Sequence, residues 1–176
     1  MYFSRFPKGN YDIKGDGNQK LVTDLMRRIK IRSKIADQIS IYDRYDVVSG
    51  ERPEDIAFKH FGDPELHWVI LLTNNISDAY YDWPLSDQEF ETYVNNKYTN
   101  PGAVHHYEIT QSSGPTSGSG PEDYSHKIEV NSDTLGAESV SNYEYERRLQ
   151  DQKRQIKLLQ PQYLGLLLSE FEKIMK

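Results

Sequence analysis

The chain has 176 residues, a formal net charge of -6 and no cysteine. This length suits one ordinary domain or a small module with long attachments, and because hydrophobic residues make up only 36% of it, we expect the apolar residues to be concentrated in a few places. The acidic balance disfavours nucleic acid as the main partner, and the lack of cysteine excludes disulfides, thiolate zinc sites and thiol nucleophiles.

The N-terminal part, residues 1–44, is predicted to be an arm followed by a helix. Residues 1–19 contain several glycines and few apolar side chains, which indicates an extended arm, and they show no basic segment leading into an apolar run. From Lys20 to about Arg32, apolar residues recur at helical spacing and predict an amphipathic helix. No stretch approaches the ~20 apolar residues that span a bilayer, so we expect a soluble protein without a membrane partner.

The next part, residues 45–100, begins with a strand at Tyr45–Val48 and a glycine turn. Pro53 then starts a helix, Gly62 ends it in the left-handed conformation, and Asp63 caps a second helix that begins with Pro64. This order predicts a small β-α-α core.

A third helix and a hairpin follow this core. Ser86 and Glu89 have the spacing of a capping box, which predicts a helix over residues 87–98. Within the part from 101 to 140, residues 103–110 and 126–130 alternate between apolar and polar side chains, which is typical of two paired strands. The Gly/Ser-rich stretch 112–121 between them predicts an exposed, flexible hairpin tip.

The last part, residues 141–176, is predicted to be helical and to bind partners. A capping box at Ser141 and Glu144 opens a helix that we expect to run from Asn142 to about Gln160, and Pro161 starts a second helix. The apolar positions of the first helix follow a coiled-coil-like spacing that one helix cannot bury alone, and its arginines suit acidic patches on a neighbour. The second helix carries a leucine-rich stripe on one face. The predicted partner-binding residues are Tyr145, Arg147, Arg148, Leu149, Arg154, Ile156, Leu159, Tyr163, Leu164, Leu167 and Phe171. The alternatives are that the charged run is a solvated helix face and that the leucine stripe folds back onto the helix from Lys20 to Arg32.

The histidines and carboxylates form no complete catalytic or metal motif. His105 and His106 are adjacent on a predicted strand and are expected on opposite faces, and His126 is expected at the far end of the facing strand, so we predict no metal site and no cofactor. Asp82 and Glu89 lie near Tyr and Trp residues, as in a glycosidase cleft, but sequence gives no sign of a desolvated carboxylate. We therefore expect no catalytic residues and favour a protein that is not an enzyme.

The segment from Tyr45 to Ile76 resembles the opening of a LysM module, whose members bind N-acetylglucosamine chains in a shallow groove. The resemblance implies that this groove lies at two turns, Ser49-Gly50-Glu51-Arg52 and Asn74-Asn75. A LysM module also has a closing strand, and here Asp82–Leu85 occupies its place with a crude match only. Peptidoglycan or glycan binding is therefore an alternative function, and a cell-wall hydrolase is a further one.

Five segments together resemble the baseplate wedge subunit 53 family of contractile-tailed phages. They are Thr23–Lys30, Tyr45–Glu54, Gly62–Leu71, Tyr143–Glu146 and Lys153–Leu164. The resemblance implies a structural virion protein of the tail baseplate that contacts other wedge and hub-proximal proteins and holds neighbouring wedges together around the hub. The expected fold is α+β, with a small LysM-like βαα core, an N-terminal helix, a peripheral β-hairpin and a C-terminal helical segment.

Overall fold

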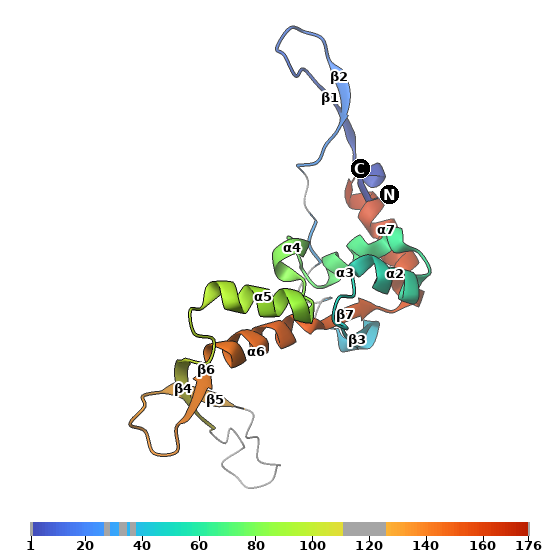
Figure 1. Ribbon diagram of the computed structural model, residues 1–176. Coiled ribbons are helices and arrows are strands. Elements are labelled where there is room, and N and C mark those ends of the chain that lie inside the picture. The colour runs from blue at the N-terminus through green and yellow to red at the C-terminus, as the bar shows by residue number, and fades with distance from the viewer. Residues whose placement is uncertain (1, 27–28, 32–34, 36–37, 111–125, 176) are drawn as a thin grey trace. The chain divides into compact units, whose positions relative to one another are not determined.

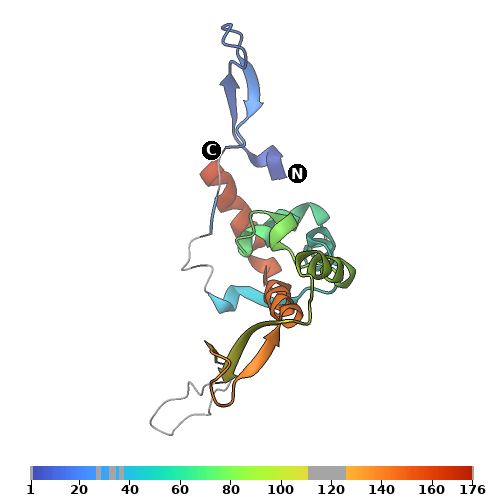
Figure 2. The same cartoon turned by 60° about the vertical axis from the view of Figure 1, so that its left-hand side comes forward.

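The computed structural model describes residues 2–26, 29–31, 35, 38–110 and 126–175. The chain forms two compact units, and Figures 1 and 2 show its ribbon from two directions. Unit 1 consists of Met1–Pro84 and Lys153–Lys176, and unit 2 consists of Leu85–Gln152. Unit 2 is therefore inserted, in sequence, between the two halves of unit 1.

A two-stranded sheet and two helical segments form the centre of unit 1. Strand β3 (Tyr42–Asp46) is followed by α2 (Pro53–Phe61), the 3-10 turn η3 (Pro64–Leu66) and α3 (His67–Thr73). The sheet is completed by β7 (Gln155–Leu159), which pairs antiparallel with β3. Unit 1 therefore has a β-α-α-β core whose closing strand comes from beyond unit 2 in the sequence.

The predicted signals for α2 are confirmed, whereas Asp63 and Pro64 begin the 3-10 turn η3, and α3 itself begins only at His67. Pro53 is the first residue of α2, and Glu54 and Asp55 lie in its first turn, where carboxylates favour the positive end of the helix dipole. Gly62 ends α2 with a φ of 79°, and the Asp63 side chain accepts a hydrogen bond of 2.8 Å from the Glu65 N–H. These local hydrogen bonds fix the corner between α2 and α3.

Two apolar clusters stabilise unit 1. The first, the sheet cluster, contains Val47, Ile56, Ala57, Ile70, Trp83, Ile156 and Leu158. The second, the α7 cluster, contains Phe6, Tyr42, Trp68, Val69, Leu159, Phe171 and Met175. Both clusters contain residues from β7 and α3, so the closing strand contributes to the whole apolar interior of the unit.

The N-terminal helix predicted from Lys20 to Arg32 is wrong at its start. After the short turn η1 (Tyr2–Arg5), strands β1 (Lys8–Tyr11) and β2 (Lys20–Thr23) form an antiparallel hairpin instead. The Asp12 carboxylate closes the connecting turn by accepting hydrogen bonds from the N–H groups of Lys14, Gly15, Asp16 and Gly17. Strand pairing across this turn outweighs the helical spacing of the apolar residues; residues 27–28 and 32–34 lie outside the described part.

Unit 2 contains two helices and a three-stranded sheet. Helix α5 (Asp87–Lys97) begins with the predicted capping box, in which the Ser86 hydroxyl accepts from the Glu89 N–H. The predicted hairpin is confirmed as β4 (Val104–Thr110) and β5 (Lys127–Val130), with Tyr107 opposite Val130. Its Gly/Ser-rich tip lies outside the described residues. A further strand, β6 (Glu138–Ser141), which was not predicted, pairs with the other edge of β4.

Helix α6 (Asn142–Arg154) starts where predicted, with the Ser141 hydroxyl accepting from the Glu144 N–H at 3.1 Å. The prediction that it continues to about Gln160 is wrong, because the chain becomes strand β7 at Gln155. Pairing with β3 satisfies backbone groups and buries Ile156 and Leu158, which outweighs the coiled-coil-like spacing. Helix α7 (Pro161–Met175) then follows.

Glu146, a buried carboxylate, ties α6 to α5. It accepts hydrogen bonds from the Lys97 ammonium and the Tyr98 hydroxyl, each at 2.7 Å. Burial raises the pKa of Glu146, but these two donors outweigh it, so the net pKa lies below its ordinary value. The carboxylate therefore stays charged, and its hydrogen bonds have a structural role inside unit 2.

Candidate functional site

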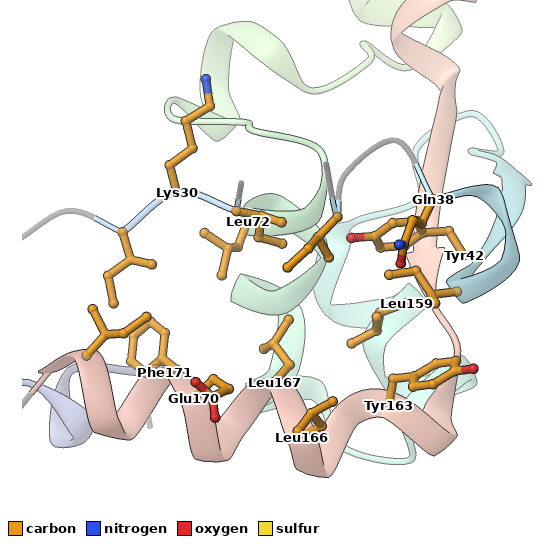
Figure 3. Close-up of a pocket in the computed structure, with 15 residues that line it drawn as sticks. Lys30, Gln38, Tyr42, Leu72, Leu159, Tyr163, Leu166, Leu167, Glu170 and Phe171 are labelled. Carbon is orange, nitrogen blue, oxygen red and sulfur yellow. The ribbon is translucent and has the colours of Figure 1, made fainter. Parts of the chain in front are cut away.

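Helix α7 and the chain segment before β3 line an open apolar cavity in unit 1 (Figure 3). Its volume is about 580 Å³. Most lining side chains are aliphatic or aromatic. The charged or amide side chains among them are Lys30, Gln38 and Glu170. A cavity of this size and composition suits an apolar group far better than an ion or a charged substrate.

One side of α7 is packed inside unit 1. Phe171 is only 3% exposed, and its ring lies 4.7 Å from the Trp68 ring and 6.3 Å from the Phe6 ring, measured between centroids. Met175 is buried beside it in the same cluster. These aromatic contacts fix the helix against α3 and the N-terminal turn.

Other positions of α7 leave large apolar side chains in contact with solvent. Leu166 is 63% exposed and Ile174 is 60% exposed, and both line the cavity, as does the half-buried Leu167 (Figure 3). The leucine stripe therefore folds back onto α3 and β7 only in part. It does not pack on a helix at Lys20, because residues Lys20–Thr23 form a strand.

The predicted partner-binding residues of α6 and β7 fall into different environments. Ile156 and Leu159 are each 3% exposed and belong to the apolar clusters of unit 1. Tyr145 stacks on the His105 ring, with centroids 3.9 Å apart. Leu149 is half-buried, whereas Arg147 is exposed.

Arg148 is held by carboxylates of unit 2. Its guanidinium donates to the two carboxylate oxygens of Glu108 at 2.7 and 3.0 Å and also pairs with Glu144. Lys127 from β5 forms a further ion pair with Glu108. Hydrogen bonds from Arg148 and Lys127 outweigh burial and lower the pKa of Glu108 to about 2. This network was missed from the sequence, where Glu108 is one polar residue in an alternating strand.

The residues predicted to form a LysM-like groove are partly used by the fold. Buried Glu51 accepts from the Tyr45 hydroxyl at 2.9 Å and pairs with Lys59. Burial raises the pKa of Glu51, but Lys59 and Tyr45 outweigh it and lower the net value. Ser49, Gly50, Arg52 and Asn75 are exposed.

Asn74, at the other side of the predicted groove, joins α3 to β7. Its amide nitrogen donates to the carbonyl oxygens of Ile70 at 2.9 Å and Lys157 at 2.8 Å. Its amide oxygen accepts from the Lys157 N–H at 2.8 Å. The sequence placed Asn74 in a binding turn, and the structure uses its side chain in hydrogen bonds within the fold.

Aromatic and acidic residues near Asp78 have contacts within the fold. Trp83 is 8% exposed, and its indole N–H donates to the Glu51 carbonyl at 2.9 Å, so its ring faces the interior. Asp78 accepts from the Tyr80 N–H at the start of α4 (Ala79–Asp82), and Glu89 belongs to the capping box of α5. Both carboxylates therefore have local structural roles.

The prediction that His105 and His106 lie on opposite strand faces is wrong. A bulge in the pairing of β4 with β6 between Val104 and His106 turns the two rings toward each other, and their Nδ1 atoms lie 2.9 Å apart. Within the described part of the chain, no group of three or more His, Asp or Glu residues has a metal-binding arrangement. Over the same residues, no helix is long and apolar enough to cross a membrane.

The described residues thus form a protein of mixed α/β fold. Residues 1–114 match the family Base plate wedge protein 53, so the chain belongs to this family and is a structural component of a phage tail baseplate wedge. It is also similar to the baseplate wedge protein gp53 of Enterobacteria phage T4, with 33% identity over 81 residues. That alignment covers 46% of this chain and 41% of the T4 protein.

Proposed function

We propose that this chain joins neighbouring baseplate wedges around the central hub, and that its partners are other wedge proteins and hub-proximal proteins. The observation that supports the proposal most directly is the exposed apolar side of α7 beside the cavity. Leu166 and Ile174 present aliphatic surface to solvent within one helix, and burial against a partner would remove that surface from water. Joining wedges requires stable contacts and no turnover, which agrees with a protein that is not an enzyme.

Different residues of α7 hold the helix in place and form the proposed contact surface. Phe171 is packed on Trp68 and Phe6, so it holds the helix in place. Leu166, Leu167 and Ile174 line the open cavity and supply the contact. Among the residues predicted on α6, Arg147 keeps an exposed side chain for an acidic patch on a neighbour.

The test is assembly of wedges with a double variant, Leu166→Asp with Ile174→Asp. Both side chains are largely exposed, so we expect unit 1 to stay folded while co-purification with the wedge proteins of the same phage is lost. Leu135→Asp is the matched control, because Leu135 is 95% exposed and lies in unit 2. Wild-type co-purification of the double variant would refute the proposed surface.

A LysM-like glycan-binding role is the second candidate, and the β3-α2-α3-β7 order of unit 1 favours it. In this order β7 pairs with β3, whereas the sequence had suggested residues 82–85 for the closing strand. The bonds of Glu51 and Asn74 inside the fold, and the burial of Trp83, leave fewer groups for a sugar. Retention of the purified chain on chitin oligomers or cell-wall sacculi would support this candidate, and absence of retention would favour a scaffold used for protein contacts.

A further inference from the structure

The two edges of the β3-β7 sheet differ in whether their outward backbone groups are hydrogen-bonded. The outer edge of β7 is covered by side chains: Asn74 bonds to both the N–H and the carbonyl of Lys157, and the His60 ring lies 2.9 Å from the Leu159 carbonyl oxygen. Residues that lie opposite each other in an antiparallel pair share the same orientation of their backbone groups. Because Arg44 lies opposite Lys157, its N–H and carbonyl also point away from the sheet partner.

Strand β3 therefore has an open outer edge. The alternation of the ladder gives Asp46 the same outward orientation as Arg44, and within the described residues no hydrogen bond reaches the backbone N–H or carbonyl groups of these two positions. Both side chains are exposed as well. An open edge next to a covered one is a template for one additional strand.

We infer that β3 binds an extended segment of another baseplate protein by strand addition, which rests on the proposed wedge-joining function. The segment would hydrogen-bond to the backbone of Arg44 and Asp46 and form a third strand beside β3. Tyr42, the first residue of β3, also lines the α7 cavity, so the open edge begins where the proposed contact surface ends. One partner chain would thus cover both.

Charge defines the chemistry of that segment. Arg44 lies directly opposite Lys157 in the sheet, so two cationic side chains share one exposed face. An acidic residue on the far side of Arg44 complements this pair, and a basic residue two positions along the added strand complements Asp46. The occupant is therefore an extended segment with an acidic and a basic residue separated by one position.

A second copy of this chain fits the edge less well. Full antiparallel pairing of β3 with β3 places Arg44 opposite Arg44, which is unfavourable. The register that places Arg44 opposite Asp46 overlaps only residues 44–46, because the strand ends at Asp46. A segment from a different protein avoids both costs.

The experiment measures binding of the full chain to wedge assemblies purified from cells infected with a phage that lacks this protein. Arg44→Pro removes an outward N–H without removing a bond to β7, and we expect affinity to fall about tenfold or more. Arg44→Glu keeps the N–H, lies favourably opposite Lys157 and repels the acidic residue of the partner, so we expect a similar fall without loss of folding. Arg44→Ala is the matched control and should change affinity least.

Three outcomes separate the inference from the function on which it rests. Wild-type affinity of Arg44→Pro and Arg44→Glu, together with lost binding of the Leu166→Asp and Ile174→Asp double variant, would overturn strand addition and leave the wedge-joining proposal standing. Wild-type affinity of all these variants would refute both. A dimer of the free chain in analytical ultracentrifugation that Arg44→Pro abolishes would identify a second copy as the occupant and overturn the inference.

Discussion

The side chain of Asn74 offers the sharpest test of how unit 1 is held together. Its amide forms hydrogen bonds with the Ile70 carbonyl, the Thr73 hydroxyl, the Lys157 carbonyl and the Lys157 N–H, and the last two attach α3 to the closing strand. Asn74→Ala removes these bonds and leaves the Lys157 N–H without its side-chain acceptor, while His60 still covers the Leu159 carbonyl. With a net contribution of roughly 1 kcal/mol for each bond, reduced by partial exposure, we expect unit 1 to lose about 2–3 kcal/mol of stability.

Urea unfolding followed by tryptophan fluorescence is the assay, because the chain has two tryptophans and both lie in unit 1. Trp68 and Trp83 are buried, so their emission reports on unit 1 and not on unit 2. Asn96→Ala, at an exposed position of α5, is the matched control and should leave the transition unchanged. If Asn74→Ala shifts the midpoint no more than this control, the structural role of Asn74 is wrong. A loss of chitin retention in that variant would indicate instead that Asn74 belongs to a glycan-binding groove.

Two further predictions concern the buried network of unit 2 and the packing of α7. The pKa of Glu108 is about 2 in the folded chain, against an ordinary value of 4.5. The stability that its charge contributes is therefore fully present above about pH 4.5 and is lost as the pH falls toward 2. Glu108→Gln should cost about 1–3 kcal/mol of stability at pH 7, and circular dichroism melts should show this difference from wild type shrinking on acidification. A difference that does not depend on pH would contradict this reasoning. Phe171→Ala should destabilise unit 1 by about 3–5 kcal/mol, whereas Leu166→Ala should change it by less than about 0.5 kcal/mol, both measured by the same fluorescence transition; equal effects would show that α7 packs differently.

The sequence predicted correctly where a signal is local. Pro53, Gly62 and the pair Ser86 and Glu89 act on backbone groups within a few residues, so both ends of α2 and the start of α5 follow from the sequence alone. The hairpin of β4 and β5 also follows from local alternation. The resemblance to the wedge subunit 53 family is confirmed by the family match over residues 1–114.

The candidate site was predictable only in part. The leucine-rich stripe of α7 was visible as a periodic pattern, but the pattern does not say which members are buried, and Phe171 is packed while Leu166 is exposed. That distinction depends on where Trp68 and Phe6 lie, and both belong to distant segments of the chain. The open edge of β3 was equally hidden, because it depends on what covers β7.

The segments from Lys20 and from Gln155 show why a periodic pattern is insufficient by itself. Both carry apolar residues at helical spacing, and both form strands. Pairing with β1 decides the first segment and pairing with β3 decides the second, because an extended segment gains its hydrogen bonds only from a partner strand. The sequence by itself determined the caps, the turns and the family, whereas the tertiary structure alone decided that a strand beyond unit 2 closes the core of unit 1.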